Sequence, residues 1–146
     1  MSATRVLTTF RGRFDGKASP THFFWGSFDL ASTLFSGRPA PPHPGGVPHC
    51  PDRVTREAYR SELWSCGYWP GGEREGDFYA YAYPSTPDLA QWPVQPSGAR
   101  WDDGLGEFVL PYEAVRTADD PDEMLTSFLT STFAAARTSA RWPAPG

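Results

Sequence analysis

The sequence predicts an α+β fold, in which a four-stranded antiparallel meander carries one C-terminal helix packed on one face. Three observations lead to this prediction. Four segments with alternating polar and apolar residues are followed by one segment with the 3.6-residue period of a helix. Turn residues, among 16 prolines and 14 glycines, separate these segments. The length of 146 residues is that of one ordinary domain, so we expect a single domain over residues 1–146.

The first strand is expected over residues 22–36, after a short lead-in over residues 1–10. Alternation places one set of apolar side chains on the core side of the sheet: Phe24, Phe28, Leu30 and Leu34. Residues 37–51 contain six prolines and three glycines. This composition predicts an extended loop rather than a further strand.

The second, third and fourth strands are expected over residues 57–69, 77–83 and 106–112. In the second strand, alternation puts Trp64 and Cys66 on the same side. In the third, three tyrosines share one face: Tyr79, Tyr81 and Tyr83. A Pro-Gly-Gly turn signal follows the second strand, and a proline follows the third.

The helix is expected from Pro121 to about Ala140. Asp120 is a good N-cap, Pro121 suits the first turn, and Glu123 stands at the capping-box position. The apolar residues then recur at helical spacing and form one face: Met124, Leu125, Phe128, Leu129, Phe133 and Ala136. This stripe is the surface that we expect to pack on the sheet.

Charge and hydropathy exclude several functional classes. The formal net charge is −4, which argues against a nucleic-acid partner because phosphate binding needs a clustered basic face. No apolar stretch is long enough to span a bilayer, so we expect no membrane partner. Two cysteines, Cys50 and Cys66, do not make a disulfide framework. We therefore expect a cytoplasmic protein with reduced thiols.

Several stretches of the chain carry a family resemblance: HFFWGSFDLAST, FSGRPAP, REAYRSELWSCGYWPGG, FYAYAYP, GEFVLPYEAVR and LTSFLTSTFAAA. On these, the chain resembles a bacterial family known only as a domain of unknown function. The resemblance covers residues 10–137 and implies that the chain corresponds to the C-terminal half of longer members, with residues 138–146 as a tail. Where members read Tyr-Ser-His-Glu, this chain reads Tyr59-Arg60-Ser61-Glu62. The resemblance implies no activity.

Three residues are candidates for catalysis. Asp29 and Glu62 are acidic residues within predicted strands, and two facing carboxylates can do acid–base work because their repulsion raises one pKa. The alternative is that each is solvated or paired with Arg38 or Arg60. Ser27 is the third candidate, although its surroundings lack the G-x-S-x-G pattern of a nucleophile elbow.

A metal site or cofactor is not predicted. His43, His49 and Cys50 lie in the Pro-rich loop, but their spacing matches no known zinc signature. The glycines after Trp69 lack the Lys-Ser/Thr ending of a phosphate loop. We expect no metal and no cofactor.

Aromatic residues suggest a ligand-binding surface. Trp25, Trp64, Tyr79 and Tyr81 are expected to line one sheet face, and such faces suit sugars, nucleobases or apolar molecules. One helix covers only one face of the sheet, so the other face is expected to meet a partner. We interpret the chain as a binding or assembly module, acting as a homodimer or with a separately encoded first half. The alternative is an enzyme or small-molecule-binding protein with a site around Trp25, Asp29 and Glu62.

Overall fold

The computed structural model describes residues 3–14, 16–18, 21–24, 29–40, 61–70 and 76–143, with the backbone alone for residues 22–24, 29 and 30. It is α+β, as predicted. Its elements, in chain order, are α1 (Ala3–Arg11), β1 (His22–Phe24), β2 (Asp29–Pro39), β3 (Ser61–Trp69), β4 (Asp77–Tyr83), the 3₁₀ turn η1 (Leu89–Gln91), β5 (Arg100–Asp102), β6 (Glu107–Pro111), α3 (Tyr112–Arg116) and α4 (Pro121–Ser139).

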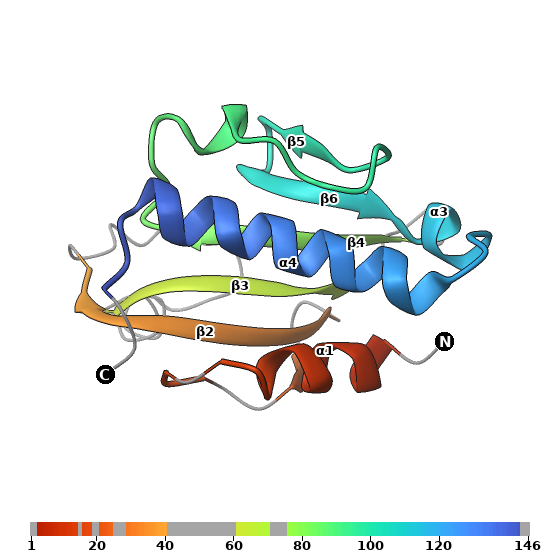
Figure 1. Ribbon diagram of the computed structural model, residues 1–146, viewed down its shortest axis with the longest axis horizontal. Coiled ribbons are helices and arrows are strands. Elements are labelled where there is room, and N and C mark those ends of the chain that lie inside the picture. Colours follow the sequence, from red (N-terminus) through yellow and green to blue (C-terminus); the bar gives the residue numbers. More distant parts are fainter. Residues whose placement is uncertain are drawn as a thin grey trace.

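The strands form one antiparallel sheet in the order β1-β2-β3-β4-β6-β5. Figure 1 shows α1 and α4 side by side on one face of this sheet. The prediction of a four-stranded meander is therefore wrong in two respects. The sheet has more than four strands. In addition, consecutive strands are not always neighbours, because the chain passes from β4 to the edge strand β5 and then returns to form β6 between them. A three-residue strand such as β5 is too short to show an alternating pattern.

The first predicted strand is in fact two strands. β1 and β2 run antiparallel, with His22 opposite Ala31 and Phe24 opposite Asp29. The continuous run of aromatic and apolar residues concealed the reversal, because periodicity alone does not mark where a chain turns back. Of the side chains predicted to face the core, Leu34 is buried there. Phe28 lies outside the described residues.

The N-terminal helix was not predicted. The segment expected as a lead-in forms α1, which has no acidic residue in its first turn and contains three threonines. Its local helix signal is therefore weak, and packing stabilises it instead. Val6 and Leu7 are buried in the core beside Leu34 of β2.

The C-terminal helix confirms the prediction made from its cap and stripe. The side chain of Asp120 accepts a hydrogen bond from the backbone N–H of Glu123, and Pro121 occupies the first turn. Leu125, Phe128 and Leu129 are buried against the sheet. The helix ends at Ser139, with Ala140 as its C-cap.

An aromatic cluster joins the two helices to the sheet. The ring of Trp64 on β3 lies 5.5 Å from that of Phe10 on α1 and 5.2 Å from that of Phe133 on α4. Trp142, in the segment expected to be a tail, packs 5.4 Å from Phe133 and 6.3 Å from Phe14. Elements from both ends of the sequence therefore complete one core.

Replacing the cap of α4 is expected to lower stability modestly. Asp120→Ala removes the hydrogen bond to the Glu123 N–H and leaves that donor to water. The free energy of unfolding should fall by about 1 kcal/mol. Urea denaturation followed by far-UV circular dichroism measures this, with Asp119→Ala as the control one residue before the cap. Equal midpoints for the two variants would contradict the capping role.

Candidate functional site

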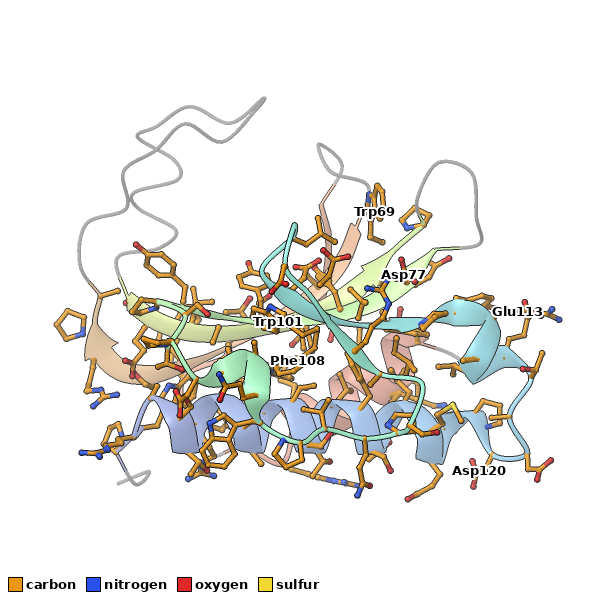
Figure 2. The ribbon with its side chains drawn as sticks, turned by 90° about the horizontal axis from the view of Figure 1, so that it is seen from above. Trp69, Asp77, Trp101, Phe108, Glu113 and Asp120 are labelled. Carbon is orange, nitrogen blue, oxygen red and sulfur yellow. The ribbon has the colours of Figure 1, made fainter. Side chains whose placement is uncertain are left out.

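The two faces of the sheet differ in what they contact. In the register, Trp64 is opposite Ala82 and Ser65 is opposite Tyr81, so Trp64 and Tyr81 lie on different faces. Figure 2 shows Trp101 and Phe108 between the sheet and α4, and Trp69 on the side away from α4. We call the side away from the helices the open face. No described helix packs on it.

The predicted aromatic surface is divided between these faces. Trp64 is only 1% exposed and belongs to the core under the helices, so the expectation that it shares a face with Tyr79 and Tyr81 is wrong. Alternation was predicted correctly within β3 and within β4. If β3 paired with β4 in a register shifted by one residue, Trp64 and Tyr81 would lie on the same face. The sequence does not determine that register.

Tyr79 and Tyr81 do lie together on the open face. Their rings are nearly parallel, with an interplanar angle of 17° and centroids 6.1 Å apart. Next to them, the hydroxyl oxygens of Thr33 on β2 and Ser65 on β3 are 3.0 Å apart. Thr33, Ser65 and Tyr81 form one cross-strand row, because Thr33 pairs with Ser65 and Ser65 pairs with Tyr81.

Two residues of this surface are buried, and its four members carry no charged side chain. Ser65 is 3% exposed and Tyr79 is 8% exposed, while Thr33 and Tyr81 are half-buried. Sequence reasoning did not select Thr33 or Ser65, because their adjacency depends on the β2–β3 register. Trp25 and Ser27, two of the predicted site residues, lie outside the described residues.

The two candidate carboxylates are far apart. Leu30 pairs with Tyr68 and Phe35 pairs with Leu63, so Asp29 lies level with Trp69, seven residues along β3 from Glu62. At about 3.3 Å per residue, this separation is roughly 23 Å. The hypothesis of a facing acid–base pair is therefore wrong.

Glu62 instead has the structural role considered as the alternative. Arg38 donates to Glu62 Oε1 from Nε at 3.0 Å and from Nη2 at 2.6 Å. Arg38 Nη2 also donates to the backbone carbonyl of Ala140 at 2.7 Å. Glu62 thus helps to join the start of β3 to the end of α4.

Two other carboxylates have lowered pKa values for structural reasons. Hydrogen bonds from Ser139 and Trp92 lower the pKa of Asp88, which ties the loop before η1 to α4. The backbone N–H of Leu105 lowers the pKa of Asp102 at the β5–β6 turn. Both groups stabilise loops.

Metal-binding geometry is not found in the part of the chain that the structure describes, where no group of three His, Cys, Asp or Glu side chains comes together. His43, His49 and Cys50 lie outside those residues. Among the described helices, none is long and apolar enough to cross a membrane.

Cys66 is expected to be unreactive in the folded protein. It is buried in the core, and burial raises the pKa of its thiol, so almost no thiolate is present near neutral pH. In a Cys50→Ser variant, where Cys66 is the remaining thiol, a disulfide reagent at pH 8 should react at least about 100-fold more slowly than in denaturant. Equal rates under the two conditions would show that Cys66 is accessible.

Of the comparisons with known proteins, the one with protein-family models gives a match. The sequence model described as a family of unknown function, DUF5996, matches residues 1–145. No curated protein and no solved structure matches the chain.

Proposed function

Since the chain belongs to DUF5996, a family of unknown function, we propose its function from the geometry of the sheet: it is a binding module, and the open face is its site. The observation that carries this proposal is the row Thr33–Ser65–Tyr81 beside the Tyr79 ring. Hydroxyl groups and aromatic rings are combined there on one face of the sheet.

The chemistry of the row favours an uncharged small molecule. Hydroxyl groups both donate and accept hydrogen bonds, so they suit ligands with hydroxyl, keto or amide groups. Tyrosine rings next to them offer apolar contact area. No carboxylate, lysine or arginine lies in the row itself, so a charged ligand would be desolvated without a partner. Free sugars and nucleosides combine flat apolar surfaces with such polar groups.

Ligand-observed NMR tests the proposal. A panel of free monosaccharides and nucleosides is screened by saturation transfer against the wild type and a Thr33→Val, Tyr81→Phe double variant. The variant removes two hydroxyl groups and little volume, so we expect the signal of a binding compound to fall at least about tenfold. Tyr112→Phe is the matched control, because Tyr112 packs on Tyr68 and Phe78 on the helix side. No signal from any compound, or equal signals in the double variant, would contradict the proposal.

Assembly is a second candidate function, favoured by Trp69. This side chain lies on the open-face side at the end of β3 and is 48% exposed, one of two large hydrophobic side chains exposed among the described residues. An exposed tryptophan is a typical centre of a protein interface. The partner is a second copy of this chain or a separately encoded first half.

Light scattering at tens of micromolar tests assembly directly. For a homodimer, we expect twice the mass of the chain, and a single-chain mass for Trp69→Glu because a charge would be buried in the interface. Leu105→Glu is the matched control, since Leu105 is the other exposed hydrophobic side chain. A single-chain mass for the wild type excludes the homodimer and leaves the ligand proposal standing.

A further inference from the structure

A cavity of about 400 Å³ lies at the end of the sheet where β2 finishes and β3 begins. The described residues that line it are Lys17, Phe35, Gly37, Arg38, Pro39 and Ser61. In Figure 1 this end of β2 lies opposite the end of the molecule that carries α3. No residue of the Thr33–Ser65–Tyr81 row lines the cavity, although Phe35 lies two residues after Thr33 on β2 and therefore on the same face of the sheet. The proposal for the cavity does not depend on the function proposed for that row.

The local sequence Ser36-Gly37-Arg38-Pro39 shapes the cavity. The β2–β3 register shifts between Phe35 and Pro39, which marks a bulge in β2. Gly37 has a φ of 92°, a conformation that favours glycine, and the backbone N–H of Arg38 donates to Ser36 Oγ at 3.1 Å. A bulge changes the direction of the side chains that follow it. Here it allows Arg38 to reach Glu62 while still lining the cavity.

Arg38 is held in place and keeps donor capacity. Its Nε and Nη2 atoms are bonded to Glu62 and to the carbonyl of Ala140. Within the described residues, its Nη1 atom donates to no acceptor. A guanidinium held in this way loses little conformational entropy when its Nη1 group binds an anion.

Lys17 is the only lysine in the sequence. The backbone pairs it with β2, because the N–H of Phe35 donates to the Lys17 carbonyl at 2.9 Å. Its ammonium lies over the Phe35 ring, 5.3 Å from the centroid, and forms no ion pair with any described residue. Among the described residues, this charge is therefore in contact with an aromatic ring rather than with a carboxylate.

Among the described residues, the balance of charge at the cavity is positive. Lys17 and Arg38 each bring one positive charge, and Glu62 beside them offsets one. Ser61 adds a hydroxyl group that has no hydrogen bond to another described residue. The described lining therefore offers an ammonium, the Nη1 group of a guanidinium and a hydroxyl, with no carboxylate among its members.

We propose that this cavity binds a small anionic molecule through its carboxylate or phosphate group. Arg38 keeps the two N–H groups of Nη1 for the oxygens of such a group, and the Lys17 ammonium supplies a second, adjustable charge. The Phe35 ring provides apolar contact for the rest of the molecule. Inorganic phosphate and benzoate are the two probes that distinguish a phosphate ligand from a carboxylate ligand.

Selective acylation of amines provides the test, because Lys17 is the only ε-amino group. The protein is treated with an acetylating ester at constant ionic strength, with phosphate, with benzoate or with chloride alone, and peptide mass spectrometry follows acetylation of Lys17 and of the N-terminal amine. We expect saturating phosphate or benzoate to slow acetylation of Lys17 at least about fivefold and to leave the N-terminal amine unchanged. Protection by one anion alone identifies the ligand chemistry.

Variants supply an independent readout. Titration of the better anion, followed by NMR, should show at least about tenfold weaker binding in Lys17→Gln. Arg116→Gln is the matched control, because it removes the same charge from α3 at the other end of the molecule. Arg38→Lys keeps the charge and loses the planar edge, and its thermal unfolding is recorded alongside. Equal weakening in Lys17→Gln and Arg116→Gln, or no difference between chloride and either anion, would overturn the proposal.

Discussion

Phe128→Ala should lower the free energy of unfolding by about 3–5 kcal/mol, the range for removing a fully buried phenylalanine side chain. Phe128 is 0% exposed and lies in the core on the face of α4 that covers the sheet. The change leaves a cavity that the rigid sheet cannot close, so the lost contacts are not replaced. Guanidinium denaturation with a fluorescence readout measures the effect.

Thr130→Ala is the control for this result. Thr130 is on the same helix but exposed, and alanine has the higher helix propensity, so its midpoint should stay the same or rise slightly. An unchanged midpoint in Phe128→Ala would show that the helix does not pack on the sheet through this residue.

Gly76→Ala should be the second strongly destabilising change, at about 3 kcal/mol, because two penalties combine. Gly76 has a φ of 98°, which is strained for alanine. A Cβ atom there would also lie 2.3 Å from the backbone carbonyl oxygen of Trp69 and 2.7 Å from Cα of Pro70. Backbone atoms cannot rotate away as a side chain can, so β3 and β4 would have to separate locally.

Variants at two other glycines separate the conformational penalty from the steric penalty. Gly106 has a φ of 70°, and a Cβ atom added there would meet nothing within 4 Å, so Gly106→Ala should show the conformational penalty alone, about 1 kcal/mol. At Gly98 the contacts would be ordinary, at 3.7 Å and beyond, and Gly98→Ala should be neutral or stabilising. Thermal unfolding should rank the three variants in this order. Equal melting temperatures for Gly76→Ala and Gly106→Ala would show that the close approach has no energetic effect.

Local signals explain which elements could be predicted. α4 has a cap, a proline in its first turn and a repeated apolar stripe, all within one segment. β4 has strict alternation, and its observed bounds match the predicted residues 77–83. In both cases the information that determines the element lies in its own residues. Alternation in β3 likewise places Cys66 and Trp64 on one face, but it does not predict their burial, because burial in this strand is continuous from Leu63 to Gly67.

The parts that could not be predicted depend on contacts between distant residues. α1 is weak as an isolated helix and is stabilised by contacts such as Phe10 with Trp64 and with Phe133. Whether Trp64 shares a face with Tyr81 depends on the register of two strands. The separation of Asp29 from Glu62 depends on the register of β2 with β3. Sequence periodicity carries no information about these pairings.

The packing of α1 beside α4 on one face of the sheet affects how the protein folds during its synthesis. Phe10 meets Phe133, and Phe14 meets Trp142, so each of these contacts spans most of the sequence. A ribosome delivers α1 and every strand before it delivers α4, and until then the apolar side of the sheet is only partly covered. Contacts between residues so far apart in the sequence slow folding, and the apolar side of the sheet stays partly exposed to solvent until α4 has been made.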